Sequence, residues 1–196
     1  VTEETPPDAD IPYARSKRAG EELIREYVQW VPGAIVWIAA VYSDWCEYPP
    51  LYTMLNNWCS GKFLESHLLA GRGRSAIPYI HVQDLVQLFL RILEKSKELE
   101  PLCVFNGGPD GAVSHLELFN IATHFYYNNA RKPFFAPRWL LAPMIMAQQV
   151  LCHLQDKEPF ERLWMLDYVD QQLVADSSRT RSRLGWKPTP RKTITR

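Results

Sequence analysis

Apolar residues recur every three or four positions after a Pro- and Asp-rich opening, residues 1–12, which is typical of a loop. This spacing predicts an amphipathic helix over residues 13–30, with charged side chains on its other face. Pro32 and Gly33 end the periodic stretch. The apolar positions of the helix are Ala19, Leu23, Ile24, Tyr27 and Val28.

Residues 34–42 form a nearly continuous apolar run of β-forming residues. Such a run is typical of a strand that is buried on both faces of a parallel sheet. We therefore expect a single buried strand directly after the first helix.

Alternating helix and strand patterns continue to the end of the chain and predict an α/β protein. Ser114 followed by Glu117 forms a capping box that should start one helix, and Asp84 is expected to cap another. The expected helices cover residues 49–62, 84–95, 114–127 and 137–154, and the expected strands cover 67–69, 77–81 and 102–105.

Residues 137–154 form the most apolar segment, but Pro143 and several polar residues interrupt it. It falls short of the roughly 18 uninterrupted apolar residues of a membrane-spanning helix. A core helix is the favoured interpretation. The same residues could instead line a pocket for an apolar substrate or contact a membrane surface.

Composition excludes several classes of function. The chain has 196 residues, enough for one compact unit, and its 22 Lys and Arg balance its 22 Asp and Glu. This balance disfavours a nucleic-acid partner.

Four widely spaced cysteines and scattered histidines predict no disulfide framework and no metal site, which favours free thiols in the cytoplasm. The opening residues show no leader-peptide pattern.

Tyr13 and Lys17 carry the candidate chemistry. At this spacing a phenol and an ammonium lie one turn apart on the same helix face. The ordinary pKa of a tyrosine is about 10, and a nearby cation favours the phenolate. The pair is therefore a candidate for general acid and base catalysis, although the same spacing also occurs by chance.

Several motifs follow one another along the chain: Tyr13 to Lys17 with Gly20–Glu22, Ala40 to Tyr42, Tyr79 to Asp84, Phe105 to Gly108, and Leu184 to Pro188. Together they resemble those of the extended short-chain dehydrogenase/reductases, the NAD-dependent epimerase/dehydratase group. The resemblance runs from Thr2 to Pro188 and corresponds to the carboxy-terminal portion of that family. No glycine-rich turn that would hold a dinucleotide pyrophosphate occurs in the chain, and we read Gly71, Gly73 and the pair at 107–108 as loop positions. Residues 176–184 resemble the closing helix of the family.

The resemblance implies a partial Rossmann-like fold with a smaller mixed α/β substrate-binding region. Residues 1–45 would be the remnant of the dinucleotide-binding domain, and residues 46–196 would mainly bind substrate. Within the second range, the helix 84–95 and the strand near 102–105 are the segments that could return to the Rossmann part.

The resemblance also implies roles for single residues. Tyr13 would exchange a proton with a substrate hydroxyl or carbonyl, and Lys17 would hold the ribose of NAD or NADP and favour the phenolate. Ala39, Ala40 and Val41 would pack beside the nicotinamide. The implied substrate-binding residues are Tyr42, Arg72, Arg74 and His81, although His81 in this motif usually anchors its own loop.

Departures from the family pattern bear on the substrate. Trp37 stands where the pattern has Arg, Ala40 where it has Asn, and Ser43 where it has Gly. Ile77 replaces an arginine that contacts a diphosphate in nucleotide-sugar enzymes, a role that Arg72 or Arg74 could take over. A nucleotide sugar and a hydrophobic alcohol or ketone both remain open, with a slight preference for the hydrophobic class.

Three functions follow. The chain can be the substrate-binding segment of an NAD(P)-dependent oxidoreductase or epimerase, inactive without an amino-terminal half that binds the pyrophosphate. It can be a catalytically silent binding or regulatory module, or a protein that docks on membranes through residues 137–154. The first is favoured. As part of a larger enzyme, the helix 13–30 and strand 34–42 should expose apolar surface, which favours a homo-oligomer.

Overall fold

The computed structural model describes residues 1–156 and 161–189, and these residues form two compact units. The first unit contains residues 1–45, 78–111 and the described residues from 174 onward. The second contains residues 46–77 and the described residues of 112–173. The parts of the expected substrate-binding region at 157–160 and 190–196 lie outside the described residues.

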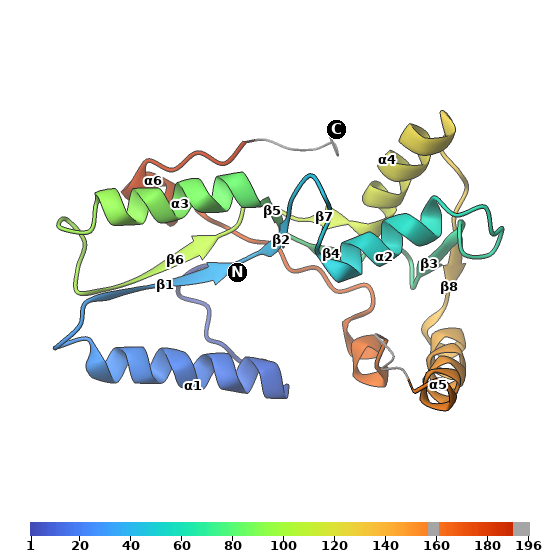
Figure 1. The fold of residues 1–196 in the computed structure, drawn as a ribbon, viewed down its shortest axis with the longest axis horizontal. Helices are drawn as coiled ribbons and strands as arrows, with labels where there is room; N and C mark the ends of the chain where they lie inside the picture. Colours follow the sequence, from blue (N-terminus) through green and yellow to red (C-terminus); the bar gives the residue numbers. More distant parts are fainter. Residues whose placement is uncertain (157–160, 190–196) are drawn as a thin grey trace. The chain divides into compact units, whose positions relative to one another are not determined.

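Parallel strand pairs organise the first unit. Strand β1 (Gly33–Ile38) pairs with β6 (Leu102–Gly107), and β2 (Ala40–Tyr42) pairs with β5 (Tyr79–His81). Helix α1 (Pro12–Tyr27) lies on one side of the β1–β6 pair and α3 (Val82–Glu94) on the other (Figure 1). The prediction of an α/β protein with parallel strands is confirmed.

The predicted single strand over residues 34–42 is wrong. The Ala39 N–H donates to the Gly107 carbonyl of β6, whereas the Ala40 N–H donates to the carbonyl of Pro78, next to β5. The chain changes partner at this point because β6 ends at Gly107. Burial on both faces is also wrong, since Ile35 is the one buried residue of β1.

The core of the first unit lies between its strands, α3 and α6 (Ser178–Leu184). Gly107 is the last residue of β6 and not a loop position, which corrects the sequence prediction. It permits this packing, since a Cβ there would lie 2.9 Å from Val36 Cγ1. The Trp186 indole N–H donates to the Asp84 carbonyl over 3.0 Å, which ties the segment after α6 to α3. The buried cluster comprises Ile80, Leu85, Leu88, Ile92, Cys103, Phe105, Leu184 and Trp186.

Asp84 does not cap α3, which corrects the sequence prediction. The N-cap is His81, whose Nδ1 accepts a hydrogen bond from the Gln83 N–H. Asp84 lies in the first turn, and its carboxylate accepts bonds from the N–H and the hydroxyl of Thr189. The carboxylate therefore fastens the chain beyond α6 to the start of α3.

The second unit contains two short strand pairs and several helices. Strand β3 (Leu68–Ala70) is parallel to β8 (Phe134–Ala136), and β4 (Ala76–Ile77) is antiparallel to β7 (Val113–Ser114). Helix α2 (Pro49–Trp58) packs on α4 (His115–Tyr127), where the Trp58 and Phe119 rings meet edge to face. The predicted capping contact at α4 is confirmed, since Ser114 Oγ accepts from the Glu117 N–H.

Helix α5 (Arg138–Leu154) confirms the predicted helix at 137–154, but the prediction that it is a core helix is wrong. Leu141 and Ile145 are its buried residues, whereas Trp139 is 76% exposed. The helix packs on the 3₁₀ helix η1 (Leu163–Tyr168). No helix among the described residues is long and apolar enough to cross a membrane.

The expected exposure of apolar surface on α1 is confirmed. None of its residues is buried, and Leu23, Ile24 and Tyr27 are all exposed. Trp30 and Val31, just after the helix, are exposed as well. An apolar face of this kind is typical of a surface that contacts another protein element.

Candidate functional site

Tyr13 and Lys17 lie in the first turns of α1. Pro12 occupies a position at the helix start where a missing N–H costs nothing, so the helix begins directly before the tyrosine. Lys17 Nζ lies 5.2 Å from the centroid of the Tyr13 ring. Tyr13 is 69% exposed, and Lys17 is exposed. The two groups are thus adjacent and accessible to a ligand.

The loop before α1 is fastened on both sides of this pair. Arg15 forms an ion pair with Asp10 over 2.7 Å, and its guanidinium holds the pKa of that carboxyl below the usual value. Arg18 donates to the Pro7 carbonyl. The neighbouring cations of α1 are therefore engaged. Within the described part of the chain, Lys17 has no ion pair.

A polar contact joins α1 to β1 one turn beyond Lys17. The Trp37 indole N–H donates to Glu21 Oε1 over 2.7 Å, and Arg25 lies 3.8 Å from the other oxygen of the same carboxylate. Val36 packs into the core on the α3 side, so Trp37 points to the α1 side by strand alternation. The contact holds the helix that carries Tyr13 and Lys17 against the strand.

Ala39, Ala40 and Val41 follow at the end of β1 and the start of β2. The N–H groups of Ala39 and Ala40 already donate to sheet carbonyls, so these two groups are not free to bind a cofactor. The side chains of all three residues are partly exposed. Their expected role beside the nicotinamide would therefore use side-chain packing, and it remains a prediction.

Tyr42 and His81 come together where β2 and β5 pair. Their rings meet edge to face with centroids 5.2 Å apart, and Tyr79 contacts Tyr42 in the same way. His81 is 2% exposed, and its Nε2 lies 3.3 Å from Asp44 Oδ1. Since Nδ1 is occupied by the helix cap, His81 anchors this corner. Substrate contact by Tyr42 or His81 remains a prediction.

Arg72 and Arg74 lie in the second unit, on the loop between β3 and β4. Their backbone N–H groups donate to the Asp170 carboxylate over 2.8–3.1 Å, and both residues are exposed. Gly71 and Gly73 have positive φ values of 62° and 70°, and a Cβ at Gly71 would lie 2.5 Å from Asp170 Oδ2. The glycines thus serve the loop, as the sequence indicated.

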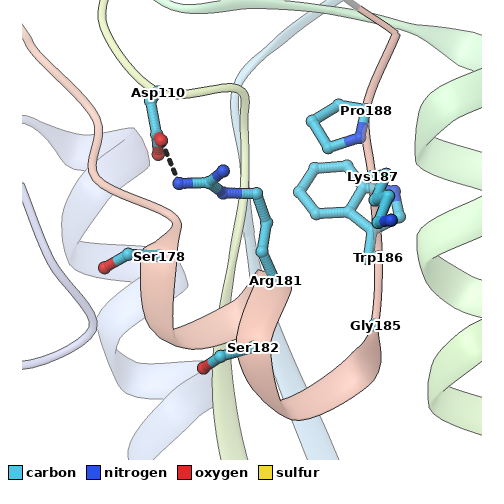
Figure 2. A pocket seen from close by; sticks show the side chains of 8 residues that line it. All are labelled: Asp110, Ser178, Arg181, Ser182, Gly185, Trp186, Lys187 and Pro188. Carbon is cyan, nitrogen blue, oxygen red and sulfur yellow. Dashed lines mark hydrogen bonds and ion pairs between the residues drawn. The ribbon is translucent and has the colours of Figure 1, made fainter.

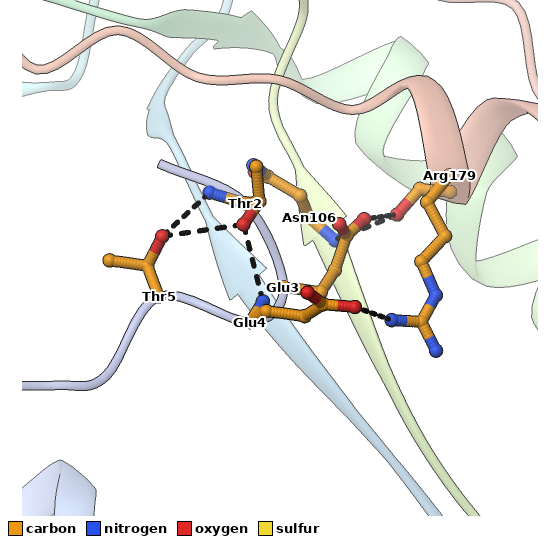
Figure 3. A network of polar contacts seen from close by, with 7 residues as sticks. Thr2, Glu3, Glu4, Thr5, Asn106 and Arg179 are labelled. Atoms are coloured by element: carbon orange, nitrogen blue, oxygen red, sulfur yellow. Dashed lines mark hydrogen bonds and ion pairs between the residues drawn. The ribbon is translucent and has the colours of Figure 1, made fainter.

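The segment before α1 is held by a polar network at the end of β6 (Figure 3). Glu3 Oε1 accepts from the Thr180 hydroxyl over 2.7 Å, and Thr180 Oγ1 accepts from the Asn106 N–H over 2.8 Å. Glu4 forms an ion pair with Arg179. These contacts fix the approach of the chain to α1.

A cavity of about 410 Å³ opens beside α6 (Figure 2). Arg181 points toward Asp110, with which it forms an ion pair, while Trp186 and Pro188 form the opposite side. The Asp110 carboxylate also accepts from the N–H and the hydroxyl of Ser177. These bonds fasten the loop after β6 to the start of α6, so the polar groups at this cavity mainly hold the fold together.

Several of these residues were not identified from the sequence. Asp44 and Asp170 act through partners that are distant in the chain, and no local pattern marks them. The sequence marks Trp37 as a departure from the family pattern but does not indicate its contact with Glu21. Glu21 was identifiable, because it lies one turn from Lys17 on the same face. No group of three or more His, Cys, Asp or Glu residues suited to a metal ion occurs within residues 1–156 and 161–189.

Solved structures show the same fold. The chain aligns with UDP-glucuronic acid 4-epimerase from Bacillus cereus in complex with NAD at 19% identity and a TM-score of 0.68, covering 98% of this chain and 52% of that one. It aligns with UDP-glucose 4-epimerase from Thermotoga maritima at 16% identity and a TM-score of 0.64, covering 96% and 52%. It aligns with dTDP-glucose 4,6-dehydratase from Bacillus anthracis at 17% identity and a TM-score of 0.63, covering 96% of this chain and 50% of that one.

The chain spans about half the length of these structures. Their similarity confirms the prediction of a partial Rossmann-like fold. A search of curated protein sequences found no match. The family described as "NAD dependent epimerase/dehydratase family" matches residues 1–108, and the chain therefore belongs to this family.

Proposed function

We propose that this chain is the substrate-binding and part-catalytic segment of an NAD(P)-dependent epimerase, dehydratase or reductase. Tyr13 acts as the acid and base on a substrate hydroxyl or carbonyl. Lys17 binds the nicotinamide ribose and favours the phenolate. The adjacency of the two side chains, with Nζ 5.2 Å from the tyrosine ring, is the observation that carries the proposal.

The residues present fit a nicotinamide cofactor at this position. Lys17 offers an exposed ammonium whose charge no described carboxylate neutralises, and Tyr13 offers an exposed phenol. When bound, the cofactor would supply hydride transfer. Ala39, Ala40 and Val41 would provide an apolar wall for the nicotinamide, and the pyrophosphate would depend on polypeptide outside this chain. The 196-residue chain alone is accordingly expected to be inactive.

The substrate is proposed to be a small molecule with a secondary hydroxyl or a carbonyl. Two structural relatives are complexes of 4-epimerases with UDP sugars, which favours a nucleotide sugar. The apolar Ile77 and the exposed apolar face of α5 favour a hydrophobic alcohol or ketone. Tyr42, Arg72, Arg74 and His81 are the proposed substrate-side residues.

The test uses the full-length protein. Tyr13→Phe removes the exchangeable proton and leaves the ring, so NAD(P) affinity should persist while turnover falls at least about 100-fold. Tyr27→Phe, an exposed tyrosine of the same helix, is the matched control and should retain turnover. Unchanged turnover in Tyr13→Phe would refute the assignment.

The second candidate is a catalytically silent binding or regulatory module. The observation in its favour is the set of departures at Trp37, Ala40 and Ser43. A full-length protein that binds NAD(P) but shows no turnover with nucleotide sugars or hydrophobic alcohols would support this alternative.

A further inference from the structure

The carboxylate of Glu21 is close enough along α1 to form an ion pair with the ammonium of Lys17. The two residues are four positions apart on α1, a spacing at which opposite charges normally attract. An ion pair between them would neutralise the ammonium on which the proposed function depends. The structure instead places Glu21 on Trp37 and Arg25.

The Glu21 contacts explain how the carboxylate is kept away. Its side chain is only 18% exposed, so its oxygens need protein donors. Trp37 supplies the shorter contact, 2.7 Å, from the neighbouring strand, and Arg25 supplies the longer one, 3.8 Å, from the next turn. Both contacts draw the carboxylate away from the turn that carries Lys17.

We propose that Trp37 is a positioning residue that holds Glu21 off Lys17 and so keeps the Lys17 ammonium free to act on Tyr13 and the cofactor. This inference rests on the proposed function of the Tyr13–Lys17 pair. It also assigns a role to Trp37, which departs from the arginine of the family pattern. An indole N–H can bind the carboxylate without adding a second positive charge beside Lys17.

The other charged groups near Lys17 cannot substitute for this arrangement. On α1 and its approach, Arg15 is bound to Asp10, Arg18 to the Pro7 carbonyl, and Arg25 already contacts Glu21. Asp8 and Glu22 are exposed to solvent, and β1 contributes no charged side chain. Arg18 and Lys17 both lie one turn from Glu21 without an ion pair among the described residues, but Arg18 is held by the Pro7 carbonyl. When Glu21 is released, Lys17 is therefore the cation that has no such contact to give up.

The test measures the pH dependence of kcat in the oxidation direction for the full-length protein. Trp37→Phe removes the indole donor and keeps an aromatic ring. We expect the pH at which kcat reaches half of its maximum to rise by about 0.3 unit. At pH values below this midpoint, kcat should fall roughly twofold. Glu21→Gln keeps an oxygen that Trp37 can bind but removes the charge, so it should leave the midpoint unchanged.

The double variant Trp37→Phe/Glu21→Gln separates this role from simple support of the helix. It should restore the wild-type midpoint, because no carboxylate remains to neutralise Lys17. If Trp37 only supports α1, the double variant should lose activity at least as much as Trp37→Phe, and the midpoint should not move. That result would overturn the inference.

Three further outcomes are decisive. If Trp37→Phe does not fold, Glu21→Gln alone still tests the arrangement, because a downward shift of its midpoint would mean that Glu21 already neutralises Lys17. If Tyr13→Phe retains turnover, the proposed function fails, and this inference fails with it. If Tyr13→Phe is inactive and Trp37→Phe leaves the midpoint in place, only the role of Trp37 is refuted.

Discussion

Replacement of Asp170 by Asn should loosen the loop that carries Arg72 and Arg74. In the structure, the Arg72 N–H lies 2.8 Å from Oδ1 and 2.9 Å from Oδ2 of Asp170, and the Arg74 N–H lies 3.1 Å from Oδ1. Asp170 has a φ of 66°, a conformation that Asn tolerates well. Asp170→Asn therefore removes the charge without adding backbone strain.

The magnitude follows from these contacts. A hydrogen bond to a charged group contributes about 1.5–3 kcal/mol, and a neutral one contributes about 0.5–1.5 kcal/mol. The amide oxygen can still accept at the Oδ1 position, so each of the two N–H groups loses about 1 kcal/mol. Because the carboxylate is partly exposed, water offsets some of this loss. We expect a total destabilisation of about 1–2 kcal/mol.

Urea denaturation followed by circular dichroism measures this loss, and hydrogen exchange at the Arg72 and Arg74 amides reports the loop directly. The control is Asp167→Asn, which removes a surface ion pair with Arg138 and should cost less than about 1 kcal/mol. If the two amides exchange as slowly as in the wild type and both variants lose equal stability, Asp170 does not hold the loop.

Two other predictions concern the first unit. Leu88→Ala should lower the free energy of unfolding by about 2–5 kcal/mol in urea denaturation, because Leu88 is fully buried in the core cluster. Leu90→Ala, at an exposed position of the same helix, should lower it far less. Equal losses of stability in the two variants would contradict the assigned core. Hydrogen bonds from Arg183 and Cys103 lower the pKa of Glu100 from 4.5 to about 2. Because the folded-state pKa is the lower one, the ionised Glu100 stabilises the fold fully above pH 4.5, and this contribution should disappear as the pH falls toward 2. Glu100→Gln should flatten the pH dependence of stability in that range, and an unchanged profile would exclude this contribution.

Interactions within one or two helical turns were predictable from the sequence. The start of α1 close to Tyr13 follows from the helical repeat, and the start of α4 follows from Ser114 and Glu117. The spacing of Tyr13 and Lys17 predicts that they share a face, and the structure places them together. Each of these features depends on neighbours that lie within a few residues in the chain.

Contacts between distant residues were not predictable. The donors to Asp170 lie up to 98 positions away, and Thr189 reaches Asp84 across 105 positions. The run at 34–42 is apolar throughout, so nothing in it marks Ala39 as the point where the chain changes strand partner. Residues 137–154 are apolar as well, and hydropathy alone could not show that most of α5 is exposed.

The sequence by itself therefore determined the helices, the α/β class and the Tyr13–Lys17 pair, because backbone periodicity and capping are local. Only the tertiary structure decided which strands pair, which apolar faces are covered and where each carboxylate finds its donors. Glu21 illustrates the difference. The spacing of four residues alone favours an ion pair between Glu21 and Lys17. In the structure α1 packs on β1, and the Glu21 carboxylate instead accepts a hydrogen bond from the Trp37 indole.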